Sequence, residues 1–188
     1  MVFDRRSFLA ASISLAATAA AAAPADPQNT VYLDTKDGRV TIQLRPDLAP
    51  KHAAQIKTLT KRGFYNGLTF HRVIAGFMAQ TGDPTGTGSG KSDLPNLPAE
   101  FTKTPFKRGT VGMARAQDPD SANSQFFICL ADSPFLDGQY TVVGEVVSGM
   151  DVVDKIKKGS KADNGAVSNP DRIVKMQLAT DAAPAKAK

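Results

Sequence analysis

The stretch FHRVIAGFMAQTGDP, from Phe70 to Pro84, is the part of the chain around which the rest is organised. Its apolar residues predict two short strands, joined at Ala75-Gly76 and closed by the Gly-Asp-Pro turn. Because successive side chains of a strand alternate between faces, Arg72 shares a face with Phe70 and Ile74. A guanidinium on an apolar face needs nearby acceptors, since burying an unpaired charge is costly. The alternative is a lone arginine that reaches into solvent at the rim of a sheet.

Two further segments are equally specific. They are GMARA at 112–116 with SANSQFFI at 121–128, and FLDG at 135–138 with Tyr140 and Val143-Gly144. Together with the stretch at 70–84, and in the same order, these segments closely resemble the signature of the cyclophilins, the cyclosporin-binding family of peptidyl-prolyl cis-trans isomerases. The resemblance extends from about Val31 to Leu178.

The resemblance implies a role for each of several residues. Arg72 would be the catalytic donor, and Gln80 the amide that orients it. The proline pocket would be formed by Phe77, Met78, Phe127 and Leu136, with Phe135 and Tyr140 at its rim, and the rest of the substrate chain would be bound by Gly86, Ala114, Arg115 and Gln125. For each apolar member, plain barrel core is the alternative, most seriously for Phe127. Phe126, one residue earlier, is expected to face the opposite way, into the core.

The implied reaction is rotation about the peptide bond that precedes proline. Its resonance barrier is roughly 18–20 kcal/mol, and uncatalysed turnover takes on the order of tens to hundreds of seconds. In the twisted transition state the nitrogen lone pair is no longer shared with the carbonyl, and no bond is broken. A catalyst therefore needs an apolar slot for the ring and a fixed donor aimed at the nitrogen. A planar, permanently charged guanidinium suits that task.

The chain departs from the best-known family members at several positions. Ala75 replaces a proline and Thr81 replaces a glycine. Arg115 replaces an asparagine, Phe135 replaces a tryptophan and Tyr140 replaces a histidine. The last two substitutions resemble bacterial exported cyclophilins. We therefore expect weak or no binding of cyclosporin, with catalysis retained.

Eight segments predict strands and two predict helices. The strand candidates are Val31–Thr35, Arg39–Leu44, the two halves of the 70–84 stretch, Gly109–Ala114, Gln125–Leu130, Tyr140–Val147 and Ile173–Leu178, and the helix candidates are Lys51–Arg62 and Met150–Ile156. Strands and helices do not alternate regularly. This pattern predicts a mainly β fold, a closed eight-stranded antiparallel barrel capped by two α-helices, as the resemblance also implies. The domain is expected to occupy residues 26–180.

Residues 1–25 have the composition of a signal peptide. A charged start at Arg5-Arg6 is followed by an uncharged run from Ser7 to Ala23, too short and too weakly apolar for a membrane span. We expect cleavage between about Ala22 and Ala25, a periplasmic location and no stable membrane anchor; an uncut anchor is the alternative. The run RRSFL at 5–9 resembles a twin-arginine export motif, although ordinary secretory signals also carry paired arginines.

The C-terminal residues and the single cysteine allow two further expectations. Residues 181–188 show no apolar periodicity and are expected to form a disordered tail. The only cysteine, Cys129, lies in an apolar strand, which indicates a small core residue rather than a nucleophile. One cysteine excludes an intramolecular disulfide. We expect a monomer.

Composition excludes several other functions. The net charge is +5, and no basic block is interleaved with aromatic residues, so nucleic-acid binding is not expected. His52 and His71 have no cysteine pair or glutamate cluster beside them, so we expect neither a metal nor a cofactor, and His71 is interpreted as a hydrogen-bonded structural residue.

The run GTGSGKS at 86–92 lacks the first glycine of a phosphate-binding loop, and Pro95 and Pro98 prevent a following helix. It predicts a surface loop that borders the site.

Two functions of different classes remain. The first is an isomerase that binds proline-containing polypeptides and assists the folding of exported proteins. The second is a binding module or chaperone that grips such segments with little turnover. The joint presence of Arg72, Phe77 and Gln80 favours the isomerase.

Overall fold

The computed structural model describes residues 26–182. The predicted signal peptide and residues 183–188 of the predicted tail lie outside this range. Asp181, the first residue of that tail, ends a short 3₁₀ turn, η4 (Ala179–Asp181). Among the described residues, no helix has both the length and the apolar character needed to cross a membrane.

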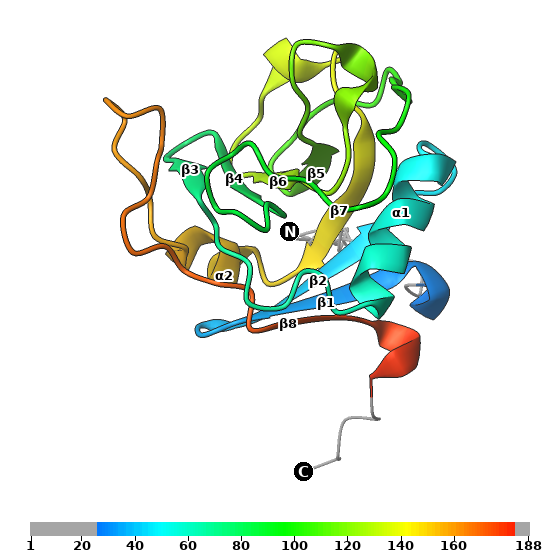
Figure 1. Ribbon diagram of the computed structural model, residues 1–188, viewed down its shortest axis with the longest axis horizontal. Coiled ribbons are helices and arrows are strands. Elements are labelled where there is room, and N and C mark those ends of the chain that lie inside the picture. The colour runs from blue at the N-terminus through cyan, green and yellow to red at the C-terminus, as the bar shows by residue number, and fades with distance from the viewer. Residues whose placement is uncertain (1–25, 183–188) are drawn as a thin grey trace, which may run out of the picture.

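One antiparallel sheet of eight strands forms the body of the protein (Figure 1). The strands are β1 (Thr30–Thr35), β2 (Gly38–Leu44), β3 (Arg72–Ile74), β4 (Met78–Thr81), β5 (Thr110–Met113), β6 (Phe126–Cys129), β7 (Val142–Ser148) and β8 (Lys175–Leu178). Their order across the sheet is β3-β4-β6-β5-β7-β2-β1-β8. All eight predicted strands are confirmed, with ends shifted by no more than two residues.

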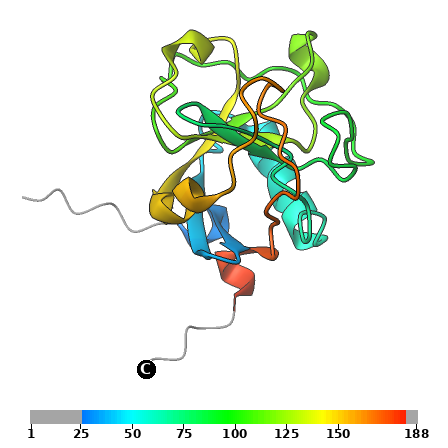
Figure 2. The same cartoon turned by 90° about the vertical axis from the view of Figure 1, so that its left-hand side faces the viewer.

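The sheet is open, which corrects the prediction of a closed barrel. It curls into a half-barrel whose end strands, β3 and β8, do not pair with each other. The segment 165–173 lies along the free edge of β3 instead: the Val73 N–H donates to the Gly165 carbonyl at 2.8 Å, and the Val167 N–H donates to the His71 carbonyl at 3.1 Å. Figure 2 shows this segment in orange beside the green strands. Because it already satisfies the edge of a very short strand, no edge of β3 is left for β8.

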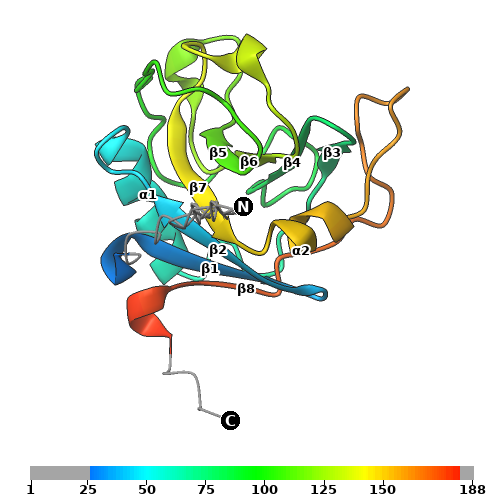
Figure 3. The ribbon, with the colours of Figure 1, turned by 180° about the vertical axis from the view of Figure 1, so that it is seen from behind.

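The two predicted helices are also confirmed. The longer helix, α1 (Pro50–Lys61), packs on β7 and β8, and the shorter helix, α2 (Met150–Lys155), packs on β2. Figure 3 shows them at opposite sides of the half-barrel. Of the apolar residues in this segment, Ile56 and Leu59 are buried, whereas Ala54 is exposed.

Pairing of β3, β4 and β6 separates the side chains of this part of the sheet onto two faces. Three neighbours on the inner face belong to the main core: Val73, Ala79 and Ile128. The adjacent positions pair in the same way, so Arg72, Gln80 and Phe127 share the outer face. The sheet therefore carries the core on one side and a row of polar and aromatic side chains on the other.

The strand β6 confirms two expectations about single residues. Phe126 belongs to the main core, whereas Phe127 packs in a second cluster on the outer face. Cys129 is fully buried, and this burial raises the pKa of its thiol to about 12. A thiol with that pKa stays protonated at neutral pH and is a poor nucleophile.

The N-terminus of α1 is capped from a distant loop. The residue before the helix, Ala49, offers no side-chain acceptor. The Glu100 carboxylate accepts the N–H groups of Lys51 and His52 at 3.2 and 3.1 Å, and the His52 ring Nδ1 lies 2.6 Å from it. Burial opposes ionisation of Glu100, but the hydrogen bonds from His52 and Lys51 outweigh it and lower the pKa of Glu100. Glu100 thus fixes the loop before β5 to the helix.

Replacement of Glu100 by alanine should lower the free energy of unfolding by about 1–3 kcal/mol at neutral pH, because two helix N–H groups lose their acceptor. Since the pKa is lowered in the folded state, this stabilisation is present above the ordinary glutamate range. It should be lost as pH falls through the folded-state pKa. Urea unfolding of parent and variant between pH 3 and pH 7 measures both effects.

The matched control for this experiment is Glu145→Ala. Glu145 is half exposed and lies 3.6 Å from Arg45, so its removal should change stability little. A difference between parent and Glu100→Ala that did not shrink in acid would contradict the assignment of the cap to the ionised carboxylate.

Candidate active site

The main hollow of the described structure, about 820 Å³ in volume, lies on the outer face of β3, β4 and β6. Loops from several parts of the chain complete its wall. Besides Arg72, Met78, Gln80 and Phe127, it is lined by predicted site residues from these loops and from the bend before β4: Phe77, Gly86, Ala114, Arg115, Phe135, Leu136 and Tyr140. Its size suits a ligand of a few residues. Eleven of the twelve predicted site residues therefore meet in one place.

The floor of the hollow is apolar. Met78, Phe127 and Leu136 are almost completely buried in one cluster, against which Phe77 packs. Phe127 finds room there because Gly112 has no side chain: a Cβ at Gly112 would lie 2.4 Å from the Phe127 ring. This aromatic floor gives an apolar ring a place to bind without hydrogen bonding.

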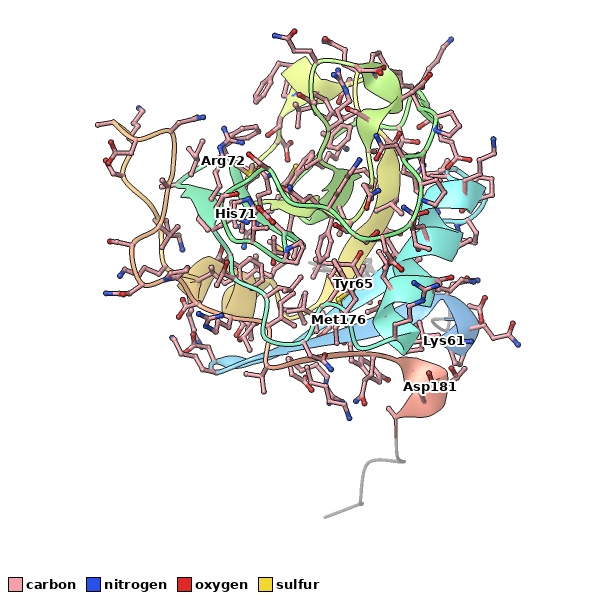
Figure 4. The ribbon with its side chains drawn as sticks, viewed as in Figure 1. Lys61, Tyr65, His71, Arg72, Met176 and Asp181 are labelled. Carbon is pink, nitrogen blue, oxygen red and sulfur yellow. The ribbon has the colours of Figure 1, made fainter. Side chains whose placement is uncertain are left out.

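Arg72 lies at the edge of this floor with its guanidinium held by three hydrogen bonds. Its Nε donates to the Asn164 carbonyl at 2.9 Å, its Nη2 to Asn164 Oδ1 at 2.9 Å, and its Nη1 to Gln80 Oε1 at 3.2 Å. Figure 4 shows Arg72 on β3, next to the loop that precedes β8. Partial burial lowers the pKa of Arg72, but an arginine so far above neutrality stays charged. The site thus contains a fixed cation beside an apolar floor.

Gln125 is the predicted site residue that does not line the main hollow. Its Oε1 accepts from Gln80 Nε2 at 2.9 Å, and its own Nε2 donates to the Gly88 and Gly90 carbonyls at 3.0 and 2.8 Å. It lies in an adjoining hollow, which it shares with Gln80, Ala114 and Arg115. Its amide therefore connects the support of Arg72 to the glycine-rich loop, and its role in holding substrate stays a prediction.

The glycine-rich loop after β4 is organised by Asp83. This buried carboxylate accepts from the Thr85 N–H at 2.7 Å, the Thr85 hydroxyl at 2.8 Å and the Gly88 N–H at 2.5 Å. Burial opposes ionisation, but these donors prevail and lower the pKa of Asp83. The loop amides are thus directed at a carboxylate of the chain itself, which agrees with the rejection of a phosphate-binding loop. As predicted, the loop borders the site through Gly86.

Arg115 forms part of the rim by closing over Tyr140. Its guanidinium carbon lies 4.5 Å from the centre of the Tyr140 ring. Its N–H groups donate to the main-chain carbonyls of Gln139, Ala116 and Gln117 at 2.9–3.2 Å. Arg115 therefore joins the end of β5 to the loop that carries the rim aromatics.

His71 does not have the hydrogen bonds expected of it. The residue is buried beside Arg72, and neither ring nitrogen has a hydrogen-bond partner among residues 26–182. Burial lowers the pKa of His71 and the Arg72 charge adds to this, while the Asp83 carboxylate acts in the opposite direction. The prediction of a hydrogen-bonded histidine is therefore wrong; the ring lies near Gly88 of the glycine-rich loop instead.

Sequence reasoning missed several residues that line the hollow. They are His71, Thr87, Gly88, Gln139, Asp163, Asn164, Ala166 and Val167. Four of them belong to the loop between α2 and β8. The Asn164-Gly165 pair is a recognisable turn signal, but the local sequence does not place that turn beside Arg72.

The architecture and the site together define a class: a curled antiparallel sheet that carries an apolar pocket with a fixed cation. Within the described residues, no group of three His, Cys, Asp or Glu side chains is arranged to hold a metal ion.

Comparison with known proteins identifies the family. The family model described as cyclophilin type peptidyl-prolyl cis-trans isomerase/CLD matches residues 30–178. A probable peptidyl-prolyl cis-trans isomerase from Brucella suis is 62% identical over 185 residues, which are 93% of this chain and 93% of that protein. The chain therefore belongs to the cyclophilin-type peptidyl-prolyl cis-trans isomerases.

Solved structures agree with this assignment. The crystal structure of cyclophilin AquaCyp293 from Hirschia baltica has a TM-score of 0.76 and 31% sequence identity, covering 85% of this chain and 77% of that one. A cyclophilin type isomerase from Cryptosporidium parvum, in the presence of the dipeptide Ala-Pro, has a TM-score of 0.73 and 27% identity, covering 79% and 98%.

Proposed function

We propose that this isomerase rotates X-Pro bonds by donating a hydrogen bond from Arg72 to the prolyl nitrogen, with the proline ring on the floor formed by Phe77, Met78, Phe127 and Leu136. The observation that carries the proposal is the guanidinium itself, fixed by Asn164 and Gln80 at the edge of that floor.

The hydrogen bonding of Arg72 leaves donors for a substrate. A guanidinium has two N–H groups on each terminal nitrogen, and the bonds to Gln80 and Asn164 take one from each. One N–H on Nη1 and one on Nη2 remain. The prolyl nitrogen accepts such a donor only when the amide is twisted and its lone pair is released. The interaction is therefore stronger in the transition state than in the ground state, which is the condition for catalysis.

The remaining predicted residues would bind the chain on either side of the proline. Ala114 and Arg115 line both the main hollow and the adjoining one, so a peptide lying in the first can continue into the second. Gly86 and Gln125 border this path. When the site holds the substrate chain on one side of the X-Pro bond, the chain on the other side can rotate about that bond. The Ala-Pro dipeptide present with the Cryptosporidium parvum relative is of the ligand class proposed here.

We further propose that the natural substrates are exported proteins and that the enzyme works as a monomer in the periplasm. This rests on the signal-peptide composition of residues 1–25 and on the resemblance of Phe135 and Tyr140 to exported bacterial members. Folding of an exported chain is slowed by each proline bond in the wrong isomer, and an isomerase in that compartment removes the delay.

Replacement of Arg72 by alanine should lower kcat/KM for an Ala-Pro-Phe peptide roughly ten- to hundredfold, because one charge-assisted hydrogen bond is worth about 1.5–3 kcal/mol. Peptide affinity should change much less, since the ground state does not use that bond. Arg72→Lys should recover little, because a point charge cannot contact both Gln80 and the substrate nitrogen. A proteolysis-coupled assay and calorimetric titration measure the two quantities.

Two further variants serve as controls for Arg72→Ala. Phe77→Ala should weaken peptide binding instead, since it opens the pocket wall. Arg62→Ala removes an exposed arginine that pairs with Asp93, away from the site, and should leave activity unchanged. Near-full isomerase activity of a natively folded Arg72→Ala protein would overturn the proposed mechanism.

Cyclosporin should inhibit this enzyme much more weakly than it inhibits family members with tryptophan at the position of Phe135. Phe135 is largely exposed and packs at a tilt against Phe77, with ring centres 5.1 Å apart, but it offers no N–H donor. Phe135→Trp should strengthen inhibition with little change in turnover. Tight inhibition of the parent enzyme in the same assay would refute this explanation.

The exported enzyme should begin between about Ala23 and Asp26 and should be found in the soluble fraction, apart from membranes. N-terminal sequencing of the protein from the cell envelope measures the first expectation. Replacing Arg5-Arg6 by Lys-Lys should stop export along a twin-arginine route and leave ordinary secretion intact. An intact Met1 on membrane-bound protein would show that the segment is an anchor.

A further inference from the structure

The loop between α2 and β8 is attached to the strand that carries Arg72. The Gly159 N–H donates to the Val73 carbonyl at 2.9 Å, and the Gly165 carbonyl accepts from the Val73 N–H at 2.8 Å. An isolated bridge pairs Arg72 with Ala166. Main-chain hydrogen bonds on both sides of Asn164 therefore fix this residue relative to β3.

Asn164 has a backbone conformation that few residues adopt. Its φ is +52°, and within residues 26–182 the only other non-glycine residue with positive φ is Asn169, at +50°. In this conformation both oxygens of Asn164 reach the same guanidinium: the carbonyl accepts from Arg72 Nε, and Oδ1 accepts from Nη2, each at 2.9 Å.

These two bonds determine how the guanidinium is oriented. Acceptors on Nε and Nη2 engage one edge of the planar group, so together they fix its rotation, whereas the single, longer bond to Gln80 at 3.2 Å does not. Because Asn164 holds this edge of the guanidinium, the N–H groups of Arg72 that have no partner point in a fixed direction. A donor that is already oriented needs no rearrangement as the substrate twists.

The acceptors are also neutral. Within the described residues, every hydrogen-bond acceptor of Arg72 is an amide oxygen, and no carboxylate forms an ion pair with it. An ion pair with a carboxylate would fix the Arg72 side chain equally well. It would, however, reduce the positive electrostatic potential at the substrate nitrogen. Asn164 combines a fixed position with an undiminished charge.

We infer that Asn164 is a positioning residue for catalysis, which orients the Arg72 donor from the loop between α2 and β8. The inference rests on the function proposed above for Arg72. Asn164 acts through Arg72, so its removal should lower the rate and leave peptide affinity nearly unchanged.

The test is Asn164→Gly, with Asn169→Gly as the matched control. Glycine accepts a positive φ and keeps the main-chain carbonyl, so the first variant removes only the side-chain acceptor. Asn169 has the same conformation and exposure in the same segment but no contact with Arg72. We expect kcat/KM to fall about three- to tenfold for Asn164→Gly, with unchanged peptide affinity, and to stay at the parent value for Asn169→Gly.

A double-mutant cycle separates this inference from the proposed mechanism. In an Arg72→Ala background, Asn164→Gly should have no further effect, because the group that it orients is gone. Equal losses in both backgrounds, equal losses for the two glycine variants, or full activity of Asn164→Gly would each overturn the role of Asn164. An Arg72→Ala enzyme with near-parent activity would instead show that the proposed mechanism has failed.

Discussion

The alternation of side chains across β3, β4 and β6 is the constraint on which the rest of the molecule depends. One set of neighbours, with Ala79 at its centre, fills the core, and the other set places Arg72, Gln80 and Phe127 side by side on the outer face. A register slip of one residue would exchange the two sets, because the side-chain period of a strand is two. The burial that stabilises the fold therefore also fixes the register of the site, and the site needs no separate device to keep its spacing.

Strand register alone does not fix a long side chain such as arginine, which has several free torsions. The additional restraint comes from far along the chain: Gln80 is eight residues from Arg72, and Asn164 is ninety-two residues away. Gln80 is held in turn by Gln125, which also binds carbonyls of the glycine-rich loop. The open edge of the half-barrel makes the contact with Asn164 possible. Because β3 does not pair with β8, the loop with Asn164 can approach Arg72 directly.

Most of the fold and much of the site could be predicted from sequence because their signals are local. Short apolar segments bounded by turn residues marked the eight strands, and the motifs that resemble the cyclophilins marked the site residues around Phe127. The features that were missed depend on contacts between distant segments. Closure of the barrel depends on what occupies the edge of β3, and the lack of hydrogen-bond partners for the His71 ring depends on how the glycine-rich loop folds around Asp83. Neither is encoded within a few residues of the position concerned.

The amide acceptors around Arg72 suit the mechanism proposed for it. A carboxylate would anchor a buried guanidinium more strongly, and the pairs at the surface of this protein use that solution, as in Arg108 with Asp154. In the mechanism proposed for Arg72, however, stabilisation of the twisted bond depends on the electric field at the substrate nitrogen, and a neighbouring negative charge would cancel part of that field. Amide oxygens of Gln80 and Asn164 restrain the guanidinium through geometry and leave its charge directed at the hollow. Partial burial then increases the effect of that charge, since less water screens it.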